Sequence, residues 1–226
     1  MTTLIKFIVT IMAALLFSSC NFNFGVQGNG NVVTENRDIS ESFTQISSAQ
    51  GIDIYLKQDE KTTIKVEADE NLINLIQTNV NGNELVVKAS KNLGMGTKKV
   101  YITLPDVSKL STSSGASINT ENHVNIHDLD IEASSGSDIK VNISADNVYS
   151  STSSGATIVL TGTAHNITAE ASSGSNIKAN DLEVKFANGS ASSGANISFN
   201  AQDKFTADES SGGNVNNQGK APKMKE

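Results

Sequence analysis

The sequence predicts an all-β protein that folds mainly as a parallel β-helix, and three observations support this. The tripeptide Ser-Ser-Gly occurs six times, at intervals of 18–21 residues, and a period near 20 is typical of a solenoid with one structural unit per repeat. Within each unit, hydrophobic and polar residues alternate as they do in strands. The composition is rich in Gly, Ser, Asn, Thr, Val and Ile, with two prolines and no tryptophan, which favours strands and tight turns over helices.

The N-terminus is predicted to be a lipoprotein signal peptide, residues 1–19. Lys6 precedes an apolar run of eleven residues, Phe7–Phe17, which is too short for a stable membrane-spanning helix but typical of a secretory signal. Leu16-Phe17-Ser18-Ser19-Cys20 resembles a bacterial lipobox, in which the signal is cleaved before the cysteine and the thiol is lipidated. The alternative is a secreted protein with one free thiol, which is a liability in an oxidising compartment. We therefore predict a membrane anchor at Cys20, the only cysteine.

The rest of the chain is predicted to be one domain with polar ends. Residues 20–30 are a tether, residues 31–215 a single β-helix domain, and residues 216–226 a polar, frayed tail. Regular coils of about 19 residues begin at about residue 108. The formal charge of −7 argues against nucleic acid or an anionic membrane surface as partner, since both bind clustered Lys and Arg.

The coils have a predicted register with hydrophobic side chains in inward columns. Three residues after each motif glycine comes a β-branched residue: Ile118, Ile139, Ile158, Ile177, Ile197 or Val215. Two positions further on come Val141, Leu160, Ala179 and Phe199, and seven before the glycine come Leu129, Val148, Ile167, Ala187 and Phe205. Odd offsets therefore face inward and even offsets face solvent, in coils about 4.8 Å apart.

The Ser-Ser-Gly motif itself is predicted to be structural. Its glycines are Gly115, Gly136, Gly155, Gly174, Gly194 and Gly212. In this register the second serine and the Ala or Ser after the glycine point inward, while the first serine and the glycine point outward. We expect a narrow edge of the coil there, where backbones approach closely and a Cβ atom would be costly.

A catalytic role for these serines is the alternative, and the sequence does not favour it. A nucleophile elbow requires Gly-x-Ser-x-Gly, which the coils lack, and a nucleophile occurs once rather than six times. His123, His127 and His165 lie between the motifs, and a third ligand at zinc-like spacing is missing. The sequence therefore predicts no catalytic residue, no metal site and no cofactor.

A second period relates alternate coils. EASSGSDIK, from Glu132 to Lys140, returns as EASSGSNIK, from Glu170 to Lys178. Glu132 and Glu170 are expected in one outward column, which Asp208 joins, and the two lysines in another. Like charges then lie about 9.6 Å apart, which lessens repulsion and disfavours edge pairing with a neighbouring molecule. A binding stripe is the alternative interpretation. In the odd coils serines occupy the acidic column (Ser111, Ser151, Ser190).

Residues 28 to about 110 form a head that keeps the strand pattern without the Ser-Ser-Gly period. Asp69 is expected to cap a short helix with Leu72, Leu75 and Ile76 on one face. Asn81-Gly82-Asn83 is expected to be a turn. Alternation predicts strands in GIDIYLKQ (51–58), TIKVEAD (63–69), ELVVKAS (84–90) and KVYITLPD (99–106).

Head and coils together resemble the putative auto-transporter adhesin, head GIN domain family, common among lipoproteins of Bacteroidetes-type bacteria. The matching words are GNGNVVTENRDIS with Phe43 and Ile46 behind it, GIDIYLKQ, IKVEADENL and VYITLPD, followed by coils bearing Ser-Gly pairs. The resemblance runs from about Gly28 to Val215. It implies a right-handed parallel β-helix in which the head strands form the first, irregular coils, and it brings no catalytic residues.

These features predict a non-enzymatic lipoprotein of the outer membrane, on its periplasmic or cell-surface face, that presents its β-helix surface to a glycan or an envelope protein. One alternative is a polysaccharide-active enzyme, which would use clustered carboxylates and a nearby Arg or Lys. The chain has a single arginine, Arg37, and aromatic side chains that could stack on sugars are scarce. The other alternative is a structural spacer in the envelope. The coil carboxylates lie mostly between motifs, without an obvious paired arrangement (Asp128, Asp130, Asp146, Asp181).

Overall fold

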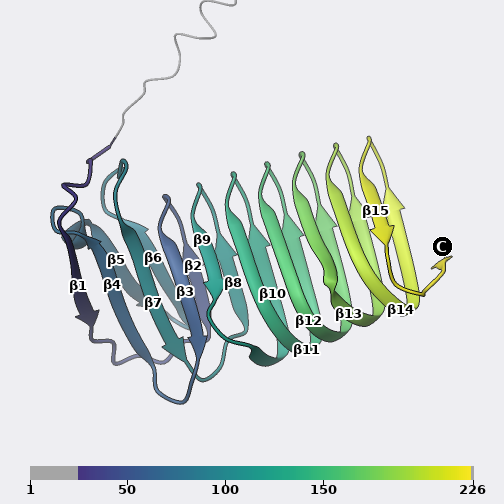
Figure 1. Ribbon diagram of the computed structural model, residues 1–226, viewed down its shortest axis with the longest axis horizontal. Coiled ribbons are helices and arrows are strands. Elements are labelled where there is room, and N and C mark those ends of the chain that lie inside the picture. Colours follow the sequence, from purple (N-terminus) through teal and green to yellow (C-terminus); the bar gives the residue numbers. More distant parts are fainter. Residues whose placement is uncertain (1–24, 225–226) are drawn as a thin grey trace, which may run out of the picture.

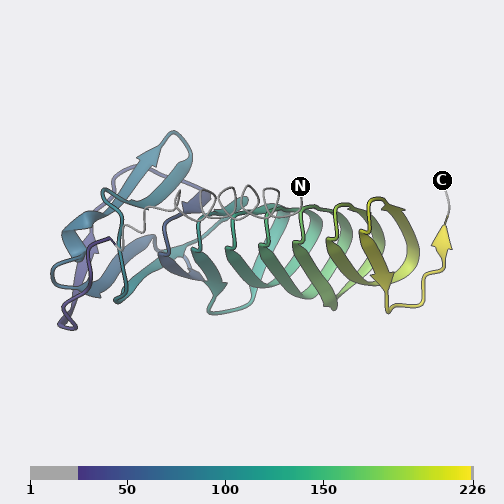
Figure 2. The ribbon, with the colours of Figure 1, turned by 90° about the horizontal axis from the view of Figure 1, so that it is seen from above.

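The computed structural model describes residues 25–224, which form a parallel β-helix closed at its N-terminal end by antiparallel strands (Figure 1). The coils stack along the long axis, and the head is the wider end (Figure 2). The predicted fold class is confirmed. The elements are β1 (Val32–Arg37), β2 (Gln45–Ser48), β3 (Asp53–Gln58), β4 (Thr63–Asp69), η1 (Ile73–Leu75), β5 (Ile76–Asn81), β6 (Glu84–Ala89), β7 (Lys98–Leu104), β8 (Lys109–Thr112), β9 (Ser117–Thr120), β10 (Val124–Ala133), β11 (Asp138–Thr152), β12 (Thr157–Ala171), β13 (Asn176–Ala191), β14 (Asn196–Glu209), β15 (Asn214–Asn217) and β16 (Lys223–Met224).

Each long coil strand contributes to two sheets. The first residues of β11 pair with β9 and its last residues pair with β10, so the two ends of the strand lie on different sides of the interior. The register of the inward hydrophobic columns is the predicted one. The inward column of Ile118, Ile139, Ile158, Ile177, Ile197 and Val215 consists of consecutive partners in the parallel ladders, and each member is at most 3% exposed. Burying one such side chain contributes about 1.5–3 kcal/mol.

The Ser-Ser-Gly motifs form tight turns at the tips of the coils, and these correct one part of the predicted register. The second serines have φ angles of 47–55° and the glycines 68–77°. The residue after the glycine donates its N–H to the carbonyl of the first serine, as Ala156 does to Ser153 at 3.1 Å. This is the arrangement of a type I′ turn. The second serine, such as Ser154, is therefore exposed rather than inward, whereas Ala156 is buried as predicted.

Backbone conformation, not crowding, is the reason for glycine at these tips. A Cβ atom built on any of the six motif glycines would have no described atom within 4 Å, so the expected narrow edge is not present at this position. The positive φ is what disfavours other residues, by about 1–2 kcal/mol. Close approach instead occurs at Gly162, where a Cβ atom would overlap the carbonyl oxygen of Ile143 in the preceding coil.

Buried hydroxyl pairs account for part of the sequence that alternate coils share. Thr112 donates a hydrogen bond to Ser137 in the next coil at 2.9 Å, and Thr152 and Ser175 form the same pair at 2.9 Å two coils later. All four are at most 3% exposed. A buried hydroxyl without a partner is costly, so Thr before one motif requires Ser after the next. The two-coil period is thus an interior feature as well as a surface one.

The head continues the β-helix with coils whose order in space differs from their order in the chain. β2 lies between β8 and β6, and β3 lies between β9 and β7, all in parallel. Antiparallel β4 and β1 then close the end. The turn between β2 and β3 is Gln50-Gly51, with φ angles of 62° and 68°. Gly51 donates to the Ser114 carbonyl at 3.1 Å, as Gly115 does to Ser135 at 3.2 Å. It is a seventh turn of the same kind, without the Ser-Ser-Gly sequence.

The helix expected after Asp69 is only the single 3-10 turn η1. The Asp69 side chain is 2% exposed, and a Cβ atom on Gly28 or Gly96 would clash with its carboxylate. Two glycines therefore make room for this buried carboxyl group. The turn at Gly82 forms as expected and joins antiparallel β5 and β6.

The chain before β1 packs on the head rather than extending from it. Val26 forms a bridge with Leu93, and Gly28 donates to the Met95 carbonyl at 2.8 Å. Residues 25–30 of the expected tether therefore contact the domain.

The polar tail is held against the last coil through Met224. β16 pairs with β14, and Ala221 is 7% exposed. Lys223 Nζ lies 2.6 Å from Glu209 Oε2, and this hydrogen bond lowers the pKa of Glu209. A carboxyl group whose pKa is lowered in the folded state stabilises the fold at pH values above its ordinary pKa, and this stabilisation is lost as the pH falls through the lowered pKa. Acid should therefore loosen the contact between the tail and the last coil. The part of residues 216–226 that the structure describes therefore packs against the domain, whereas a frayed tail was expected.

Candidate functional site

The predicted lipid site, Cys20, lies among residues 1–24, outside the described residues. The six motif glycines lie at exposed turn tips, as described above. Between residues 25 and 224, no helix has the length and hydrophobicity needed to span a bilayer.

The motif serines are expected to be chemically ordinary. Nucleophilic catalysis needs a base within hydrogen-bonding reach, whereas the exposed second serines lie half a coil away from the histidines. A fluorophosphonate probe, followed by peptide mass spectrometry, should label no serine among Ser114, Ser135, Ser154, Ser173, Ser193 and Ser211. Stoichiometric labelling of one of them, lost on its replacement by Ala, would contradict this and favour a hydrolase.

The histidines contact their own neighbours rather than one another. Within the described residues, no group of three His, Cys, Asp or Glu side chains could hold a metal ion. The nearest contacts are His123 Nδ1 with Asn142 Oδ1 (2.9 Å), His127 Nδ1 with Asp146 Oδ2 (2.5 Å) and the His165 ring with the Phe186 ring (5.4 Å between centroids).

The charged columns lie in the predicted register. Glu132 and Glu170 flank Ser151, and Lys140 and Lys178 flank Val159. Part of this charge is neutralised within the chain: Lys109 donates a hydrogen bond to Glu132 at 2.6 Å, which raises the pKa of Lys109. These contacts fit the interpretation of a solvated face with alternating charges.

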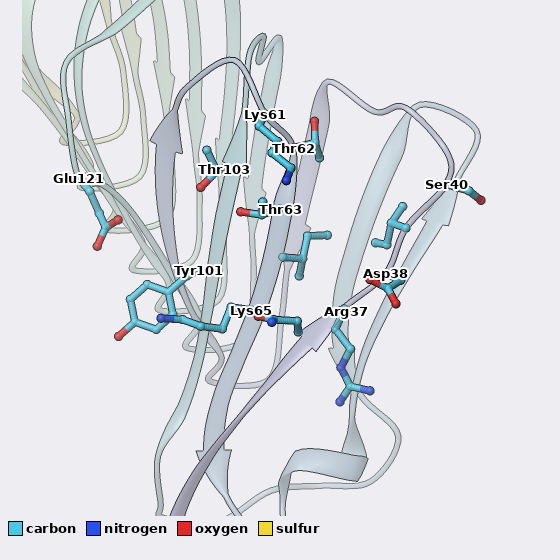
Figure 3. A pocket seen from close by; sticks show the side chains of 13 residues that line it. Arg37, Asp38, Ser40, Lys61, Thr62, Thr63, Lys65, Tyr101, Thr103 and Glu121 are labelled. Carbon is cyan, nitrogen blue, oxygen red and sulfur yellow. The ribbon is translucent and has the colours of Figure 1, made fainter.

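A hollow of about 1000 Å³ lies on the head, beside the end of β1, the turn before β4, and β7 (Figure 3). Its charges are mixed, with Arg37, Lys61 and Lys65 near Asp38 and Glu121. The labelled side chains in Figure 3 point in different directions rather than toward one centre.

Two of the three cations that line this hollow, Arg37 and Lys65, already have partners. Arg37 donates to the Ile73 carbonyl at 3.0 Å and pairs with Glu35 at 2.9 Å. The Lys65 ammonium lies 4.4 Å from the centroid of the Tyr101 ring. Burial raises the pKa of Tyr101, so the phenol stays neutral at ordinary pH. We find no set of groups here that converges on a ligand.

A second groove, of about 600 Å³, crosses strands β11–β14. Tyr149 and Phe186 line it, and within residues 25–224 they are the two exposed Tyr or Phe side chains, at 53% and 39%. Amide and hydroxyl side chains lie between and beside the rings, and Lys204 is the one charged residue among the described residues of the lining (Asn147, Asn166, Thr168, Asn188, Thr206). This groove is the better candidate binding site, because its exposed rings have no evident role in the fold.

The groove was not predicted from the sequence. Tyr149 lies in a column with Asp130, Thr168 and Asn188, so it departs from the polar pattern of that outward position. An aromatic residue at an even offset was the signal that could have identified it.

Three solved structures share the fold. A putative adhesin from Bacteroides fragilis has a TM-score of 0.75 at 21% identity, covering 85% of this chain and 99% of its own. A putative lipid binding protein from Parabacteroides distasonis has a TM-score of 0.64 at 20% identity, covering 88% and 99%. A putative adhesin from Parabacteroides merdae has a TM-score of 0.59 at 20% identity, covering 88% and 99%.

No curated protein matches the chain. A family model matches residues 42–221, which include the head strands from β2 onward and all the coils. The chain belongs to the family described as putative auto-transporter adhesin, head GIN domain.

Proposed function

We propose that this protein is a non-enzymatic lipoprotein, anchored in the outer membrane through Cys20, that binds an envelope or extracellular partner on the outward face of its coils. The observation that carries the proposal is the groove across β11–β14, which both exposed Tyr and Phe side chains of the described residues line. Exposed apolar groups in a concave site indicate binding more than they indicate a spacer. Membership of an adhesin-type family supports a surface or envelope location.

The coil carboxylates support a non-enzymatic role. Asp128 accepts a hydrogen bond from Asn147 at 2.7 Å, and Asp130 pairs with Lys109 at 3.0 Å. A pair of carboxylates acting on a glycosidic bond would instead face each other across a sugar. These groups are engaged in stabilising adjacent coils.

The lipid anchor is tested by labelling. Cys20→Ser should abolish incorporation of radiolabelled palmitate and shift the protein from the detergent phase to the aqueous phase, because the acceptor thiol is lost. Ser19→Ala should remain labelled, since it keeps a small residue before the cysteine. Persistent labelling of Cys20→Ser would show that the lipobox interpretation is wrong.

Binding is tested with isolated cell envelopes. The full chain with Cys20→Ser, fluorescently labelled, should bind envelopes saturably, and unlabelled protein should compete. A spacer would give neither result. Protease treatment of intact cells would then decide between the periplasmic and cell-surface faces, because only a surface protein is accessible.

A further inference from the structure

The two rings of the groove are placed as a divided stacking platform. Asn147 is in register with Asn166, which is in register with Phe186, and Tyr149 lies two residues beyond Asn147. With coils about 4.8 Å apart and residues about 3.3 Å apart, the Cα atoms of the two aromatic residues lie about 12 Å from each other. The rings can therefore contact two different units of one extended ligand. The edge-on contact of His165 with Phe186, at 5.4 Å, holds one ring in place.

The polar groups between and beside the rings are fixed before a ligand arrives. Asn166 donates to Asn147 at 2.8 Å, Asn147 donates to Asp128 at 2.7 Å, and Thr206 donates to Asn188 at 3.0 Å. A side-chain amide has two N–H donors and two acceptor lone pairs, so each amide keeps capacity for the hydroxyl groups of a ligand. Because neighbours already hold these side chains, binding orders them at little entropic cost.

The charges in and around the groove favour a neutral ligand. The chain has 24 acidic side chains, yet the described residues of the lining include none. Glu170 and Asp208 follow two residues after Thr168 and Thr206, so they border the groove on one side. An acidic ligand would lie beside these two carboxylates, which outnumber the single cation of the lining, Lys204, and would be repelled.

The alternation of ring faces and hydrogen-bonding groups suits a sugar better than a protein. A protein interface has a contiguous, fully buried apolar core, whereas polar side chains separate Tyr149 from Phe186. A sugar presents C–H groups on its ring face and hydroxyl groups at its edge. We infer that the groove binds a neutral oligosaccharide or polysaccharide chain, with Tyr149 and Phe186 stacked on different sugar units. This inference rests on the proposed binding function and names its ligand class.

The test begins with the full chain carrying Cys20→Ser on an array of neutral and acidic glycans. We expect binding to neutral glycans and none to acidic ones. The chain contains no tryptophan, so Tyr149→Trp introduces a single indole at the platform and keeps an aromatic face there. Its fluorescence should change saturably when the neutral glycan found on the array is titrated.

Two substitutions then locate the site. Tyr149→Ser and Phe186→Ser should each weaken binding about tenfold or more, since each removes one stacking surface. Lys178→Ser, an exposed position in the other sheet of the coils, should leave affinity unchanged and serves as the matched control. All three replace exposed side chains, so thermal unfolding should confirm an intact fold in each.

Several outcomes would overturn the inference, and they differ from failure of the proposed function. Saturable envelope binding without any glycan binding would leave the binding function standing and reject the ligand class. Envelope binding lost after protease but retained after periodate, which cleaves sugar diols, would identify a protein partner. Glycan binding that survives both serine substitutions would place the site elsewhere. Absence of all envelope binding would reject the proposed function itself.

Discussion

Ile158→Asp is expected to lower the free energy of unfolding by about 4 kcal/mol or more. Ile158 is 0% exposed and lies between Ile139 and Ile177 in the central inward column. The substitution removes an aliphatic contact with each neighbouring coil and buries a carboxylate with no partner. Because each coil is stabilised only by its neighbours, the defect interrupts the stack. Denaturant or thermal unfolding of the full chain measures the loss.

Val159→Asp is the matched control at the next residue. Val159 faces outward and is half-buried, between Lys140 and Lys178 in adjacent coils. A carboxylate there stands between two ammonium groups, so we expect little change or a slight gain in stability. Equal losses from the two substitutions would mean that the inward and outward assignments of this strand are wrong.

The coils could be predicted because each inward position is repeated in every turn. A residue such as Ile158 has an equivalent about 19 residues away on either side, so periodicity alone aligns the column, and parallel pairing converts that alignment into contacts. The alternation of Glu132, Ser151 and Glu170 was predicted for the same reason. Periodicity did not indicate the buried hydrogen bond between Thr152 and Ser175, which contributes to the two-coil period.

The head could be predicted only as strands, because its coils close through pairs far apart in the chain. Thr44 hydrogen-bonds Ser108 across 64 residues, and no repeat in the sequence marks that distance. The turn at Gln50-Gly51 could have been predicted from the sequence, because Ile54 follows Gly51 by three residues just as Ile118 follows Gly115. The helix expected after Asp69 is only the 3-10 turn η1, although Leu72 is buried and Leu75 packs against the core.

The candidate groove could not be predicted from the repeat. The repeat identifies the residues that the coils have in common, whereas the aromatic residues of the groove are ones that the other coils lack. Tyr149 and Phe186 occupy outward positions that are polar in other coils, at different offsets from the motif. Their proximity depends on the stacking of coils, and it is visible only once the register is known.

Gly162→Ala is expected to cost about 3 kcal/mol or more, and Gly174→Ala about 1–2 kcal/mol. Both glycines have positive φ, at 107° and 69°, a conformation that glycine adopts freely and alanine disfavours. Only at Gly162 would the new Cβ atom also overlap the backbone of Ile143 in the preceding coil. Relief would require adjacent coils to separate, with loss of ladder hydrogen bonds in β11 and β12.

Gly174→Asn separates the effect of backbone conformation from the effect of crowding. Asn tolerates positive φ better than Ala does, and the tip has room for its side chain. We expect it to be less destabilising than Gly174→Ala, whereas Gly162→Asn should be as damaging as Gly162→Ala, since no change in φ preference removes a clash with the backbone. Unfolding midpoints of the four variants measure the difference. If Gly174→Ala and Gly174→Asn cost as much as the substitutions at Gly162, then the Ser-Ser-Gly tips are crowded, and the narrow edge expected from the sequence exists at the motif after all.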